Sequence, residues 1–295
     1  MTSTQSLRAI SASHHASGRW NTSSVAPRNS LLRALINFGS FKRQGVNDLA
    51  RRCAGVPSGR LTNTMALDAG CGNGSYARWF LSGAPQATVI ALDWTWQPLK
   101  AMPKTIEGTI LRVCADLHHL PFKASVFAAC YSVDTLGHLA RVPMALNEIA
   151  RVCRDSASLF MHSECNDYQN RWPDKTLIKR IGADQPAQAD SHVGLMAAAE
   201  LRSLYTARFT VQTFSSPAGL LGWLIGYPHK YAPAFKAARM PFFYAVCLTV
   251  AFLRRLPVIG LFIRFVNVIT NHFELFVGIE NGGSCFAVMK KPAQS

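Results

Sequence analysis

The sequence predicts an α/β protein with a doubly wound parallel sheet. From Thr64 onwards, short apolar segments alternate with helical ones, which is typical of strands joined by crossover helices. A glycine-rich loop directly follows the first of these strands, and 295 residues are enough for one large α/β domain or two small ones. The expected strands are residues 65–68, 88–93, 109–114, 126–132, 158–163, 208–214 and 285–289.

Helices are expected before and between these strands. In the first, residues 30–53, apolar side chains recur on one side at helical spacing, and a Pro-Ser-Gly sequence then breaks the chain. The other expected helices are residues 75–82, 97–102, 142–153 and 191–205.

The charged residues divide the chain into a near-neutral body and two basic segments. Of the formal charge of +15, nearly all comes from residues 1–47, with six basic side chains and no acid, and residues 201–273, with eight and no acid. This division predicts a disordered or targeting tail at 1–29, a core at 30–214, an apolar and basic helical insert at 215–282, and the last strand of the core with a short tail at 283–295.

Composition excludes several classes of protein. A chain with 49% hydrophobic and 16% charged residues is not intrinsically disordered. Eight cysteines without a CxxC pair exclude a disulfide scaffold, predict no metal site and favour a reducing compartment. The first thirty residues lack the apolar run of a secretory signal. We therefore expect a cytoplasmic protein with peripheral membrane contact, or a mitochondrial-matrix protein if the tail is a transit peptide.

The loop from Asp68 to Gly74 has the clearest chemical meaning. Gly70, Gly72 and Gly74 alternate between the first strand and the next helix. Glycine permits tight turns, and bare backbone lets a ligand approach closely. The spacing differs from the dinucleotide fingerprint GxGxxG, and the loop contains no cation, so a pyrophosphate would meet backbone only.

Two more acids follow the next two strands. Asp93 closes the second strand, where a carboxylate can accept hydrogen bonds from both ribose hydroxyls. Asp116 follows the third strand, where a carboxylate can accept the exocyclic amine of an adenine. Because the carboxyl ends of parallel strands meet at one edge of the sheet, Asp68, Asp93 and Asp116 are expected in a line along the ligand-binding edge. Three helix caps are the alternative.

With these segments, the sequence resembles the class I S-adenosylmethionine-dependent methyltransferases, of the small-molecule type that includes the ubiquinone and menaquinone methyltransferases. The matching segments are residues 67–74, 89–93, 115–122 and 146–152. The resemblance implies a Rossmann-like, seven-stranded sheet with an antiparallel last strand, and S-adenosylmethionine as the cofactor. It also implies the residues that hold this cofactor: Asp68, Gly70, Cys71, Gly72, Gly74, Asp93, Trp94, Asp116, Leu117 and Ser132.

Two features depart from the family pattern. Ala128 stands where the family usually has Asp, and residues 154–157 replace a Pro-Gly-Gly turn. The second change removes the glycines of a tight turn, so the start of the fifth strand must differ. Neither change falls on a position assigned to the cofactor.

Methyl transfer is an in-line displacement, in which the protein mainly aligns donor and acceptor. An oxygen acceptor also needs a base, and the candidates near the carboxyl edge are His138, Asp134, Glu164 and Tyr168. His138 follows the fourth strand and has a suitable intrinsic pKa, so it is the predicted catalytic residue, with a packing role as the alternative.

The insert contains apolar runs separated by basic residues. Its longest uncharged run, residues 240–253, is shorter than the ~20 residues that span a bilayer. Because Pro257 and several arginines interrupt the chain near it, no transmembrane helix is predicted. The insert is expected to contact an anionic membrane surface or to cover a lipophilic substrate as a lid, with a dimer interface as the alternative.

Three functions follow from these observations. The expected one is methyl transfer to a hydrophobic small molecule, such as an isoprenoid, a quinone-like ring or a lipid. RNA methylation is the second, suggested by a pI near 9.8, although the basic residues alternate with aliphatic runs rather than with stacking platforms. The third is a non-catalytic methyltransferase-like protein that binds a partner through the insert. Nucleic acid is not the expected partner.

Overall fold

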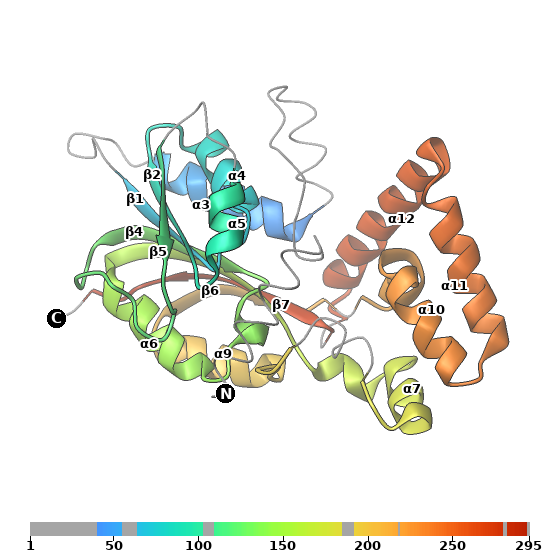
Figure 1. Cartoon of the computed structure of the whole chain (residues 1–295). Coiled ribbons are helices and arrows are strands. Elements are labelled where there is room, and N and C mark those ends of the chain that lie inside the picture. Colours follow the sequence, from blue (N-terminus) through green and yellow to red (C-terminus); the bar gives the residue numbers. More distant parts are fainter. Residues whose placement is uncertain are drawn as a thin grey trace. The chain divides into compact units, whose positions relative to one another are not determined.

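A seven-stranded sheet forms the centre of the α/β part of the structure (Figure 1). The computed structural model describes residues 40–54, 64–102, 109–184, 192–217, 219–279 and 282–293. The strands are β1 (Met65–Ala69), β2 (Thr88–Asp93), β3 (Thr109–Cys114), β4 (Phe127–Val133), β5 (Cys153–Glu164), β6 (Thr210–Ser215) and β7 (Ser284–Lys290), in the order β3-β2-β1-β4-β5-β7-β6.

The strand order creates a ligand-binding edge. Strands β1 to β5 are parallel, and the order reverses between β1 and β4, where such sheets open a crevice at their carboxyl ends. Next to β5, the N–H of Ser156 donates to the carbonyl of Lys291 at 3.1 Å, and the N–H of Lys291 donates to the carbonyl of Ala157 at 2.9 Å. The predicted Rossmann-like sheet with an antiparallel last strand is confirmed.

Helices connect the strands close to where the sequence predicts them. They are α3 (Phe41–Ala54), α4 (Ser75–Gly83), α5 (Trp96–Ala101), α6 (Val142–Val152) and α9 (Ala198–Thr206). The predicted tail at 1–29, and residues 30–39 of the first predicted helix, lie outside the described residues.

Two predicted boundaries are wrong. Strand β5 begins at Cys153 rather than at residue 158, and the register between β4 and β5 shifts where Ser156 adopts a φ of 60°. A bulge thus replaces the family's glycine turn. Helix α9 begins at Ala198 rather than at residue 191, because the Asp167 carboxylate accepts the N–H of Ala198 at 2.7 Å and the Glu200 carboxylate accepts that of Ala197 at 2.9 Å.

The chain forms two compact units. Of the described residues, the first contains those from 40 to 163, 201 to 214 and 286 to 293, and the second contains those from 164 to 200 and 215 to 285. The sequence places residues 164–200 in the core, whereas the structure groups them with the insert.

The second unit consists mainly of helices. Besides α7 (Asp174–Ile181), it contains the π-helical turn η3 (Gly222–Gly226), α10 (Pro228–Ala237), α11 (Pro241–Leu253) and α12 (Pro257–Phe276). Its core is aromatic: the Phe235 and Phe243 rings stack at 5.3 Å, and Trp223 meets Phe235 edge-on at 5.5 Å.

Helix α12 continues where the sequence predicts an interruption. Pro257 takes the first helical position, where its missing N–H costs no hydrogen bond, and the helix runs through Arg264 for 20 residues. Within the part of the chain that the structure describes, α12 is the one helix whose length and composition suit a membrane span. The sequence predicts no transmembrane helix, because its longest uncharged run is too short. By length and composition, this prediction is wrong for α12.

Helix α3 lies very close to β5. A Cβ atom at Gly45 would lie only 2.0 Å from the Phe160 ring, and one at Gly83 in α4 would lie 3.0 Å from the Ala50 side chain. Val46, Trp79 and Tyr131 belong to the same buried apolar cluster. The core beside α3 thus depends on a backbone approach that only glycine permits.

We expect Gly45→Ala to reduce the free energy of unfolding by about 1–3 kcal/mol, because the added methyl overpacks the core. In an unconstrained helix interior, the same change stabilises a protein by about 1 kcal/mol. Urea denaturation measures the difference. Asp48→Ala, at an exposed position of the same helix, is the control. A stabilised Gly45→Ala variant would show that the close approach is wrong.

Candidate active site

The glycine loop joins β1 to α4 and is held against the end of β2. Gly70, Gly72 and Gly74 have φ values of 84°, 51° and 72°, which L side chains rarely adopt. The N–H groups of Gly70 and Cys71 both donate to the carbonyl of Leu92, at 2.9 and 2.8 Å. The backbone of this loop is therefore tightly placed.

Asp93 fixes the loop from the neighbouring strand. Its Oδ2 accepts the N–H of Gly72 at 3.0 Å, and its Oδ1 accepts the N–H of Thr95 at 2.9 Å. The side chain is buried. A carboxylate oxygen can accept two hydrogen bonds, so a carboxylate that holds backbone amides can also contact a ribose hydroxyl.

Asp68 ends β1 as a buried acid with an unsatisfied oxygen. Its Oδ2 has no hydrogen-bond partner among the described residues. Burial raises the pKa of Asp68 well above its usual range, and the Asp93 carboxylate raises it further, while the Tyr131 hydroxyl and the Ala77 N–H oppose the rise. A cation beside Oδ2 would relieve this cost. The site therefore fits a ligand with a positively charged group at this point.

Asp116 lies two residues beyond β3. Its Oδ1 accepts the backbone N–H of His118 at 2.9 Å and lies 2.7 Å from Nδ1 of the same residue. The neighbouring Leu117 is buried, and the N–H of Ala115 donates to the carbonyl of Asp93 at 3.0 Å. The ends of β1, β2 and β3 thus carry the three predicted acids along one edge of the sheet.

The remaining predicted cofactor residues have structural contacts. Cys71 is buried, which raises the pKa of its thiol so that it stays protonated. The carbonyl of Trp94 lies 3.5 Å from the Cys114 sulfur. The fully buried Ser132 hydroxyl donates to the carbonyl of Ala69 at 2.8 Å and so ties β4 to β1.

A charged cluster at the ends of β4 and β5 includes two residues that sequence reasoning missed. Asp134, just after β4, has a φ of 56°, and its N–H donates to the carbonyl of His162 at 3.1 Å. Its carboxylate lies 2.8 Å from Nδ1 of His162 and forms an ion pair with Lys42 of α3. Lys42 and His162 carry no local sequence signal, because Lys42 is 92 residues from Asp134 along the chain.

The charges in this cluster set its protonation. Burial acts to raise the pKa of Asp134, but Lys42 and His162 hold it well below the usual range. Burial lowers the pKa of His162 and the charge of Lys42 lowers it further, while the Asp134 carboxylate acts to raise it. The cluster therefore contains a carboxylate and a neutral imidazole near pH 7.

The other candidate bases lie in different surroundings. His138 ends the 3₁₀ turn η1 (Leu136–His138) after β4, and its N–H donates to the carbonyl of Thr135 at 3.0 Å. Glu164 and Tyr168 belong to the second unit, where the Tyr168 hydroxyl donates to Asp184 at 2.7 Å.

Comparison with known proteins shows which family the residues of this site resemble. Residues 67–161 match the family described as methyltransferase domain, a segment that includes the glycine loop and all three acids. This part of the chain is similar to a methyltransferase domain. The predicted recognition of S-adenosylmethionine-dependent methyltransferases is confirmed, and S-adenosylmethionine is the cofactor that this family implies.

Relatives agree with this assignment. The chain is 29% identical over 140 residues to the ubiquinone/menaquinone biosynthesis C-methyltransferase UbiE of Syntrophotalea carbinolica. The match covers 46% of this chain and 56% of that enzyme, so the chain spans about half the length of this relative.

Solved structures share the fold at low sequence identity. The [4+2]-cyclase SpnF has a TM-score of 0.51 and 14% identity, with 99% of this chain and 96% of that chain covered. A phosphoethanolamine N-methyltransferase 2 of Haemonchus contortus has the same score and identity, with 99% and 59% covered. A cyclase and a methyltransferase therefore share this architecture, and the site must carry the functional argument.

Proposed function

We propose that this protein transfers a methyl group from S-adenosylmethionine to a hydrophobic small molecule, such as an isoprenoid, a quinone-like ring or a lipid. The observation that carries the proposal is the edge formed by the glycine loop and the three acids at the ends of β1, β2 and β3. The family match over the same residues supports it.

The described residues fit S-adenosylmethionine. The Oδ2 atom of Asp68, which has no hydrogen-bond partner, could bind the ammonium group of the cofactor's methionine moiety. The tightly packed backbone from Gly70 to Gly74 could contact the same moiety. Asp93, at the end of β2, would bind the ribose hydroxyls, and Asp116 with Leu117 would hold the adenine. When bound, this cofactor supplies an electrophilic methyl group on a positively charged sulfur.

A lipophilic acceptor is supported by two separate observations. The curated relative acts, by its name, in ubiquinone and menaquinone biosynthesis. In the second unit, large apolar side chains such as Phe242, Phe252 and Phe276 are mostly exposed. A protein that handles only polar substrates has no evident use for such a surface.

We propose His162 as the group that removes a proton from the acceptor. Neutral imidazole accepts a proton, and the Asp134 carboxylate at its Nδ1 orients the ring and stabilises the imidazolium. The proton lost by an acceptor hydroxyl, amine or activated ring carbon would pass to Nε2 of His162 as the methyl–sulfur bond breaks. Lys42 keeps Asp134 ionised and so acts as a positioning residue.

Methyl transfer itself is tested by supplying a methyl-labelled donor and a lipid extract to the purified protein. We expect label in an organic-soluble product. Label that enters added RNA instead would support the alternative of RNA methylation. Cofactor binding without label transfer to either pool would support a non-catalytic binding protein.

His162→Gln should lower kcat about 100-fold or more, a typical loss for a general base, and leave cofactor binding unchanged. Because burial and Lys42 lower the pKa of His162, the acid limb of the wild-type kcat profile should fall below pH 6.5. Steady-state kinetics from pH 5 to 8 measures both effects.

His119→Gln, at an exposed position, is the control for His162→Gln and should retain wild-type kcat. If His138→Ala loses activity and His162→Gln keeps it, the base is His138, as the sequence predicts.

A further inference from the structure

Helix α12 has an apolar face that the second unit leaves uncovered. Seven of its side chains, spaced three or four residues apart or adjacent, are between 47% and 88% exposed. At 3.6 residues per turn, this spacing places them on one side along the whole helix. We call them the α12 face: Val258, Leu261, Phe262, Phe265, Ile269, Phe273 and Phe276.

The opposite side of α12 is anchored at both ends. The buried Glu274 accepts the N–H groups of Gly219 and Leu220, at 2.7 and 3.0 Å. A Cβ atom at Gly260 would lie 2.3 Å from the Arg254 carbonyl oxygen, so the start of α12 packs tightly on the end of α11. Helix α12 therefore packs on the second unit through this side, and the α12 face stays exposed.

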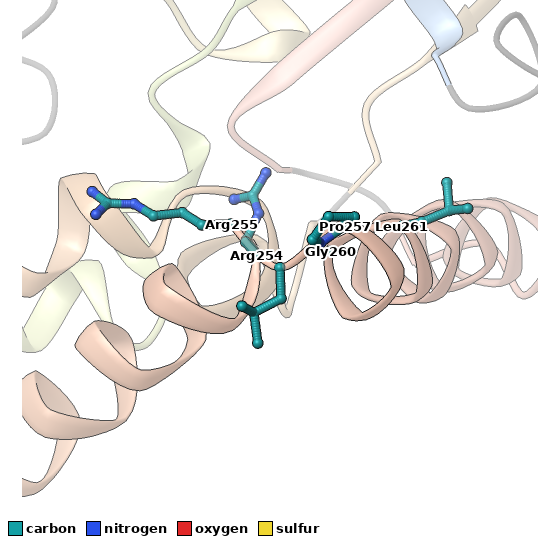
Figure 2. Close-up of a pocket in the computed structure, with 6 residues that line it drawn as sticks. Arg254, Arg255, Pro257, Gly260 and Leu261 are labelled. Carbon is teal, nitrogen blue, oxygen red and sulfur yellow. The ribbon is translucent and has the colours of Figure 1, made fainter.

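The turn between α11 and α12 places basic and apolar groups together. Arg254, Arg255, Leu256, Pro257, Gly260 and Leu261 line a hollow of about 310 Å³ at this turn (Figure 2). Arg255 is exposed, while an Arg254 guanidinium nitrogen donates to the Gly226 carbonyl. Apolar side chains next to arginines are typical of a segment at the headgroup depth of a bilayer.

The charged side chains of the described residues from 219 to 279 are basic, apart from Glu274. Lys236 and Arg239, at the end of α10, are exposed as well. Among the described residues from 215 to 285, the acid is Glu274, which is buried and engaged with two backbone amides. This surface is complementary to anionic lipid, whereas a second copy would bring the same positive charge against it.

We propose that the α12 face lies in the interface of an anionic lipid bilayer, with α12 along the membrane surface. The helix is long enough to cross a membrane, but crossing would require it to leave the Glu274 and Gly260 contacts, which hold both of its ends in the unit. The exposed Arg255 at the turn and the basic end of α10 then contact lipid phosphates. This inference does not depend on methyl transfer, because it concerns lipid binding alone.

The test is co-sedimentation of the full chain with vesicles of phosphatidylcholine alone and with 30% phosphatidylglycerol. We expect at least tenfold tighter binding to the anionic vesicles, weakened by 0.5 M NaCl. A carbonate wash should release the protein from the vesicles. Equal binding to both vesicles, or resistance to carbonate as a spanning protein shows, would overturn the proposal.

A matched pair of variants tests the face itself. The double variant Phe262→Asp, Phe265→Asp should lose anionic-vesicle binding at least tenfold. Val193→Asp places one of these two charges at an exposed apolar position of this unit outside α12 and should bind as the wild type does. Circular dichroism and S-adenosylhomocysteine binding check that both variants are folded.

Light scattering tests whether a second copy of the chain, rather than a membrane, covers the α12 face. A wild-type dimer that becomes a monomer in the double variant, with no vesicle binding by either, would show that a second copy covers the α12 face and would overturn the membrane proposal.

Discussion

The hydrogen bond from the Gly72 amide to the Asp93 carboxylate ties the glycine loop to the neighbouring strand. Two more amides of the loop donate to the carbonyl of Leu92, so the end of β2 holds the loop in place. The loop can take this path because its three glycines adopt positive φ angles. Once it is fixed, the acids at the ends of β1, β2 and β3 form one polar edge, and the remaining site is arranged around that edge.

The sequence predicts this edge because its parts are local. Asp68, Asp93 and Asp116 each lie at or within two residues of the end of a strand, and the topology of parallel strands brings them together. The cluster of Lys42, Asp134 and His162 could not be predicted in the same way. It exists only because α3 packs on β5 closely enough to bring Lys42 to the end of β4, and that approach depends on tertiary contacts at Gly45.

Other differences also have physical causes. The sequence divides the α12 region at Pro257 and the arginines, but proline is tolerated at a first helical position and one arginine does not interrupt backbone hydrogen bonds. Strand β5 begins at Cys153 and contains an irregularity at Ser156, in place of the glycine turn that the resemblance implies. The net charge of +15 is also unevenly distributed. The edge formed by the ends of β1, β2 and β3 is acidic, whereas the basic residues from 230 to 255 lie in the unit with the exposed apolar helix.

The central claim is that the acidic edge binds S-adenosylmethionine. Titration calorimetry with S-adenosylhomocysteine, on the wild type and on Asp93→Ala, tests it most directly. Because hydrogen bonds to a carboxylate contribute about 1.5–3 kcal/mol each, the wild type should bind and Asp93→Ala should bind at least about tenfold more weakly. Asp48→Ala, which removes an exposed acid from α3, should bind as the wild type does. No binding by the wild type, or equal binding by Asp93→Ala, would contradict the account.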